Sequence, residues 1–132
     1  MSNDATAELL QLSQRLLDCI AAGDWLTYQE LCDPSLTAFE PEGCGQLIEG
    51  LAFHHFYFDS NEQHPRNRTA MIRPQVRLLG DVAIVCYVRI NQRGTPDGRT
   101  QSTAFEETRI WHRQDGRWRH VHFHRSAIPT PR

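Results

Sequence analysis

Three arginines stand where a charged side chain needs a partner. Arg89, Arg109 and Arg125 each lie in a strand-like run, two positions from an apolar or aromatic residue or an acid. Because alternate side chains of a strand share one face, each arginine is expected on a partly buried surface. If these faces coincide, the cluster needs anions, since burying unpaired cations is costly. The pattern predicts a pocket for a small carboxylate or, equally, arginines that lie on a solvated rim or pair with separate acids.

A second set of side chains could perform acid–base chemistry in the same place. Glu107 shares a strand face with Arg109 and could serve one arginine as an internal counter-ion. With His54 and Tyr28 it could instead act in a small-molecule isomerase or hydratase, although Tyr28 fits the edge of a core equally well. No GxSxG, P-loop or dinucleotide-binding motif is present. We therefore assign no catalytic residue, keep Glu107 and His54 as the alternative pair, and expect no cofactor.

Three histidines alternate near the end of the sequence. In a regular strand His120, His122 and His124 would share one face and could offer three imidazoles to a metal. No acid lies in that run, and neither an HExxH nor a CxxC pattern occurs. We predict a half-exposed or interface face and no metal site.

Composition limits the classes of partner. The chain has 132 residues, and we expect one domain over 1–132. The formal net charge of −2 gives no argument for nucleic acid or an anionic membrane as a partner. All fourteen basic residues are arginine, whose planar guanidinium suits carboxylates.

Four cysteines, none in a CxxC pair, and a polar start without a signal-peptide pattern indicate a reducing, cytoplasmic setting. Cys19 and Cys86 lie in apolar patterns and are expected to be buried thiols. No apolar run approaches the roughly 18 residues that a membrane span needs.

The elements that must position these residues change character half-way along the chain. Apolar residues at steps of three and four predict a helix over 4–22, and shorter helices are expected over 25–32 and 46–59. Strands are expected over 35–41, 69–79, 82–92, 100–113 and 117–128, separated by glycine-containing turns. We therefore predict an α+β fold in which N-terminal helices pack on a curved antiparallel sheet.

One predicted strand is apolar on both faces. Five apolar residues alternate along it: Val82, Ile84, Cys86, Val88 and Ile90. The opposite face carries Ala83, Val85 and Tyr87, so this strand needs cover on both sides. The helices can cover one face, and a second copy of the chain is the simplest cover for the other. We therefore expect a homo-oligomer.

Two long runs resemble a known family. TAFEPEGCGQLIEGLAFHHFYF (37–58) and EETRIWHRQDGRWRHVHFHRS (106–126) resemble the association, or hub, domain of calcium/calmodulin-dependent protein kinase II. CDP (32–34), GDVAIVCYVRI (80–90) and the N-terminal helix also fit, so the resemblance covers essentially the whole chain. The wider superfamily is the nuclear-transport-factor-2-like (SnoaL-like, cystatin-like) cone fold, which agrees with the predicted order of elements.

The resemblance implies more than the strand pattern does. Domains of this family form dimers through their sheets, the dimers build closed rings, and no catalytic activity of their own is known. Their cone holds an arginine-lined pocket for small carboxylates. By motif, the pocket residues carry over to this chain as follows: Arg89 in YVRI, Arg109 in EETR, Arg125 in FHRS, His54 in AFHHFYF and Tyr28 before CDP.

The sequence departs from the family in ways that limit the inference. These 132 residues contain no kinase domain, no basic calmodulin-binding helix and no variable linker, so we expect a stand-alone relative without kinase activity or calmodulin binding. His55 replaces an arginine that is common in the family, and residues 59–68 differ in sequence.

Overall fold

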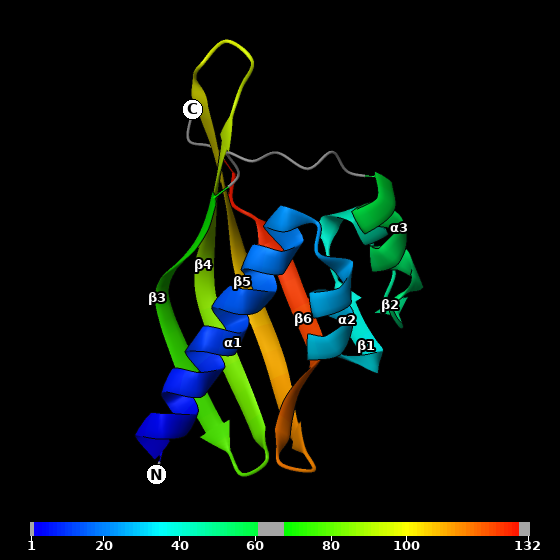
Figure 1. Ribbon diagram of the computed structural model, residues 1–132, viewed down its shortest axis with the longest axis vertical. Helices are drawn as coiled ribbons and strands as arrows, with labels where there is room; N and C mark the ends of the chain where they lie inside the picture. The colour runs from blue at the N-terminus through cyan, green and yellow to red at the C-terminus, as the bar shows by residue number, and fades with distance from the viewer. Residues whose placement is uncertain (1, 61–67, 130–132) are drawn as a thin grey trace.

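A six-stranded sheet with helices across one face organises the computed structural model, which describes residues 2–60 and 68–129 (Figure 1). The elements follow in this order: α1 (Ser2–Ala22), α2 (Trp25–Leu31), β1 (Cys32–Phe39), the 3-10 turn η1 (Pro41–Gly43), β2 (Ile48–Glu49), α3 (Ala52–Ser60), β3 (Arg68–Leu79), β4 (Val82–Gly94), β5 (Thr100–Gln114) and β6 (Arg117–Ala127). The predicted α+β class is confirmed, and the four long strands lie within two residues of their expected bounds.

The strand order explains how distant segments meet. The sheet runs β2-β1-β6-β5-β4-β3, and β3 to β6 form the expected antiparallel meander. The expectation of a wholly antiparallel sheet is wrong at one place, because β1 pairs with β6 in parallel. Since a parallel pair needs a long connection, this contact reflects tertiary packing and leaves no local signal in the sequence.

Helix α1 supplies the apolar cover of one sheet face. Leu9, Leu16 and Leu17 are fully buried and pack in the same core as Val85 and Trp111. We call the face that α1 covers the inner face. Within residues 2–60 and 68–129, no helix is both long and apolar enough to cross a membrane.

The third predicted helix is shorter than expected. The range 46–59 was predicted as one helix, but Ile48 and Glu49 form β2, and α3 starts only at Ala52. Gly50 has φ 78°, a left-handed conformation that interrupts a right-handed helix. Pairing of β2 with the end of β1 outweighs helix propensity at this point.

The apolar row of β4 lies on the outer face of the sheet. Ala83, Val85 and Tyr87 are buried on the inner face, whereas the five residues of the row are only half-buried. Cys86 belongs to this row, so its predicted burial in the core is wrong, although Cys19 is buried as expected. A hollow of about 530 Å³ lies on this side; its lining includes Val88, Ile110 and other residues of β4, β5 and β6.

Candidate functional site

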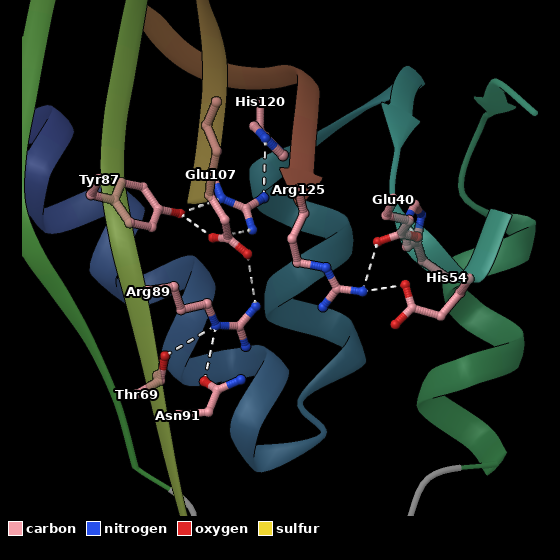
Figure 2. A network of polar contacts seen from close by, with 11 residues as sticks. Glu40, His54, Thr69, Tyr87, Arg89, Asn91, Glu107, His120 and Arg125 are labelled. Atoms are coloured by element: carbon pink, nitrogen blue, oxygen red, sulfur yellow. Dashed lines mark hydrogen bonds and ion pairs between the residues drawn. The ribbon is translucent and has the colours of Figure 1, made fainter. Parts of the chain in front are cut away.

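A buried carboxylate lies at the centre of the inner face (Figure 2). Glu107 is 2 % exposed, and its Oε2 accepts a hydrogen bond from Arg89 Nη1 at 3.2 Å. Its Oε1 accepts from Arg109 Nη2 at 3.2 Å and from the Tyr87 hydroxyl at 2.6 Å. Burial alone would raise the pKa of Glu107, but the two arginines and the tyrosine hydroxyl outweigh burial and lower it. Glu107 is therefore an ionised counter-ion with both oxygens occupied.

Arg109 is the most deeply held of the three arginines. It is 1 % exposed, and its Nε donates to the Tyr87 hydroxyl at 2.7 Å. Its guanidinium carbon lies 4.5 Å from the centroid of the Phe123 ring, a cation–π contact. Burial raises the pKa of Tyr87 to about 12, so at neutral pH the hydroxyl keeps the proton that it donates to Glu107.

His120 completes the surroundings of Arg109 as a neutral ring. Arg109 Nη1 lies 3.3 Å from His120 Nε2, and arginine can only donate, so Nε2 accepts. The proton then sits on Nδ1, which lies 3.5 Å from the buried Sγ of Cys32. Burial lowers the pKa of His120 well below 6.5, and the charge of Arg109 lowers it further.

Arg125 lies opposite Glu107 on the neighbouring strand β6, but its side chain pairs with two other acids. Its Nη2 is hydrogen-bonded to Oε2 of Glu42 and lies 3.6 Å from Oε2 of Glu40. Its guanidinium carbon lies 4.8 Å from the centroid of the Phe105 ring. The Glu40 side chain is 7 % exposed, whereas that of Glu42, on η1, is 38 % exposed. Glu42 is therefore the partner that can exchange most easily with another anion.

His54 and Tyr28 form the third side of the cluster. His54 Nε2 donates to Glu40 Oε1 at 2.8 Å, which connects the histidine to Arg125 through a shared acid. The His54 and Tyr28 ring centroids lie 5.8 Å apart, and both residues are buried. Burial raises the pKa of the Tyr28 hydroxyl well above its usual value, so this hydroxyl stays protonated at neutral pH.

Several polar atoms of this cluster have no partner within the described residues. Arg125 Nε and His54 Nδ1 are buried without a hydrogen bond there. Arg89 bonds Glu107 through Nη1 and bonds Thr69 and Asn91 through Nε, while its Nη2 has no bond to the described residues. Unpaired buried polar atoms are rare in native proteins, and a bound molecule or water commonly satisfies them.

The histidine row is divided by a β-bulge. The pairing of β5 with β6 shifts between Ile110 and Trp111, so an extra residue, Val121, separates His120 from His122. His120 therefore faces inward with Phe123 and Arg125 and is fully buried, so the expectation that it lies on a half-exposed or interface face is wrong. His122 and His124 stay on the outer face, so the three rings do not converge. In the part of the chain that the structure describes, no three His, Cys, Asp or Glu side chains group as metal ligands.

The comparisons with known proteins decide the family. A profile of the calcium/calmodulin dependent protein kinase II association domain matches residues 5–129. The chain belongs to this association-domain family. It is 43% identical over 126 residues to calcium/calmodulin-dependent protein kinase type II subunit delta of Oryctolagus cuniculus. That match covers 93% of this chain but only 24% of the rabbit protein, so the chain spans about a quarter of its relative.

Solved structures agree with this membership and with the fold. The association domain of C. elegans CaMKII shares 40% identity with this chain at a TM-score of 0.89, covering 95% of this chain and 97% of that one. An NTF2-like superfamily protein from Salmonella enterica matches at a TM-score of 0.80 with 19% identity, covering 98% of this chain and 95% of that one. The second likeness shows the fold alone. The predicted association-domain family and its cone fold are confirmed.

The structure groups the predicted site residues of this association-domain chain into two sets. Glu107 joins Arg89 to Arg109, and Glu40 joins Arg125 to His54. Sequence patterns did not point to Glu40 or Glu42, and they placed His120 on the wrong face. Glu40 had a usable signal, because it follows Leu36 and Ala38 at alternate positions and is an acid on an apolar face. Glu42 and His120 had none, since a turn and a bulge place them.

Proposed function

We propose that this chain is a homo-oligomerising, association-domain-like module with an arginine-lined pocket for a small carboxylate. It acts as one domain in the cytoplasm, without a cofactor, nucleic acid or membrane as partner. The single observation that carries the pocket is Arg125 Nε, a buried donor with no hydrogen bond to the described residues. Neither kinase activity nor calmodulin binding is proposed for these residues.

The outer face of the sheet supports self-association. The half-buried apolar row of β4 continues across Ile110 of β5 toward His122 and His124 of β6. Phe39 at the end of β1 is 39% exposed and lies beside both histidines, with ring centroids 6.4 and 5.6 Å away. Pairing this face with its equal in a second copy would bury the row in a symmetric dimer. Dimers of this kind are the proposed unit of any ring.

A charge in the middle of this face should dissociate the assembly. The wild type is expected to scatter light as a dimer or a larger ring at micromolar concentration. Val88→Asp places a carboxylate in the centre of the apolar row, where dimerisation would bury it unpaired, and is expected to give a monomer. The matched control Ser102→Asp adds the same charge at an exposed site of β5 and should leave the mass unchanged. A monomeric wild type would refute the proposed assembly.

Carboxylate binding at Arg125 requires exchange of an internal acid. Glu42 occupies Arg125 from an exposed position, whereas Glu40 is buried and also bonded to His54. An incoming carboxylate would replace Glu42 and accept hydrogen bonds from Arg125 and Arg89. Removing the positive charge of Arg125 should therefore weaken ligand binding. Removing the negative charge of Glu42 should strengthen it.

Pentanoate, a small compound with one carboxylate, serves as the probe ligand. Arg125→Ala is expected to weaken its binding about 10- to 100-fold, because charge-assisted hydrogen bonds are worth about 1.5–3 kcal/mol. Glu42→Gln is expected to strengthen it about 3- to 10-fold, since it removes the competing charge. Titration calorimetry or ligand-observed NMR measures both. Glu49→Gln, an exposed acid on β2, is the matched control and should leave the affinity unchanged. Equal affinities for the wild type and both test variants would reject this role of Arg125.

The isomerase or hydratase alternative has less geometric support. It requires Glu107 as an acid or base, yet this carboxylate is buried, has a lowered pKa and accepts hydrogen bonds at both oxygens. An acid–base residue needs a free oxygen within reach of the substrate. These contacts favour ligand binding over turnover.

A further inference from the structure

A second cavity opens beside Arg89, toward the hairpin that joins β4 to β5. It has a volume of about 390 Å³, within the range typical of small-molecule sites. The C-terminal end of α1 forms one wall, and β4 and β5 form another. Arg89 lines this cavity and also bonds Glu107, so the cavity and the arginine pocket share one buried side chain.

A polar track leads from the buried end of this cavity to its exposed end. Arg89, Asn91 and Arg93 alternate along β4 and so point to one face of the strand. The pairing of the strands places Thr103 opposite Asn91, and Gln101 opposite Arg93. Arg89 is 5% exposed, whereas Arg93 is exposed, so the track has a cation at each end.

The charges around this cavity are unbalanced. Arg68 on β3 adds a third cation to the lining, and none of the described lining residues is acidic. At the buried end Arg89 and Arg109 share a single carboxylate, Glu107, which leaves one positive charge in excess. The nearby Tyr87 is neutral at neutral pH, because burial raises its pKa to about 12. A buried excess charge of this kind favours a bound anion.

The excess positive charge also affects the pKa of Arg89. Burial lowers the pKa of its guanidinium, Glu107 opposes this, and the charges of Arg109 and Arg125 lower it further. Its Nη2 makes no hydrogen bond to the described residues. Arg89 is thus a buried donor with Arg125 on one side (Figure 2). It also lines the cavity together with Arg93 and Arg68.

We propose that the ligand of this pocket is a dicarboxylate, held by Arg89 and Arg125 at one end and by Arg93 at the other. This inference rests on the proposed carboxylate-binding function and names the class of ligand for it. Arg93 lies four positions after Arg89, which places their backbones about 13 Å apart along the strand. Glutarate, with one carboxylate at each end of a short carbon chain, is the probe for a ligand that contacts both ends of this cavity. Arg93 and Arg68 then select the second carboxylate.

The test compares glutarate with pentanoate, which has the same number of carbons and one carboxylate. Titration calorimetry on the full chain is expected to show glutarate binding about 3- to 10-fold tighter than pentanoate, as one added charge contact allows. Arg93→Gln is expected to abolish this preference while leaving the affinity for pentanoate unchanged. Arg99→Gln is the matched control, because Arg99 is exposed on the same hairpin and does not line the cavity.

The outcomes separate this inference from the function on which it rests. If pentanoate binds and glutarate binds no tighter, the dicarboxylate inference is overturned and the carboxylate pocket stands. If glutarate is preferred but Arg93→Gln keeps the ratio, the assignment of the second carboxylate to this cavity is overturned. If neither compound binds, the proposed carboxylate function itself fails.

Discussion

Replacing Glu107 with glutamine should destabilise the folded chain by about 3–5 kcal/mol, the usual cost of breaking a buried ion pair from one side. Glu107 is the shared counter-ion of Arg89 and Arg109, whose side chains are 6% and 1% exposed. An amide keeps the shape but removes the charge, so two buried guanidinium groups lose their anion. Urea unfolding at one fixed protein concentration measures the change in free energy.

Asp81→Asn provides the matched control for Glu107→Gln. Asp81 forms an ion pair with Arg113 on the surface, where both side chains are about half or more exposed. Exposed pairs contribute about 1 kcal/mol or less, so this substitution should have a small effect. If Glu107→Gln and Asp81→Asn lowered the free energy of unfolding by the same small amount, Glu107 would not be the counter-ion on which the inner face depends.

His120 should make the folded chain less stable as the pH falls below about 6.5. The folded state holds this ring neutral between Arg109 and Cys32, while the unfolded chain binds a proton at an ordinary histidine pKa. Below about pH 6.5 the unfolded state therefore binds more protons than the folded state. The free energy of unfolding of the chain then falls by up to about 1.4 kcal/mol for each pH unit. This decrease in the free energy of unfolding ends only when the pH reaches the lowered folded-state pKa of His120. Above pH 7 the ring is neutral in both states, so none of this stability is lost.

The slope with pH separates titration from packing. His120→Gln keeps an acceptor for Arg109 but removes the titrating ring, together with its contacts to Trp111 and Phe123. We expect a constant loss of stability above pH 7 and a shallower decline between pH 6.5 and 5, measured by urea unfolding at several pH values. His122 adds a weaker contribution of the same sign, because burial lowers its pKa as well. Parallel curves for the wild type and His120→Gln over this range would show that His120 does not titrate as described.

The parts of the fold that follow short-range rules could be predicted. Apolar spacing located α1, and Asp24 caps α2 by accepting a hydrogen bond from the Thr27 amide at 3.1 Å. The left-handed Asp115 and Gly116 form the turn between β5 and β6 at the expected place. Alternation also placed Arg89 and Arg109 correctly on the inner face. Each of these features depends on residues within a few positions of one another.

The parts that depend on pairing between distant segments could not be predicted. Gln46 to Leu51 had a helical pattern, yet the edge of β1 and the left-handed Gly50 produce β2 and a shorter α3. Cys86 lies in a strand run that seemed equally suited to burial on both faces, and only the position of α1 decides which face is covered. The role of the arginines as ligand-binding residues stays a prediction that the calorimetry above can test.

The sequence by itself determined that charged side chains would face an apolar interior, because a strand's period of two is a local property of the chain. Only the tertiary structure decided which acids neutralise Arg125 and which way His120 faces. The parallel pairing of β1 with β6 brings Glu40 and Glu42 to Arg125, more than eighty positions away. The bulge at Val121 turns His120 inward against Arg109. Both depend on contacts between segments that are far apart in the chain, where the alternation of one strand carries no information.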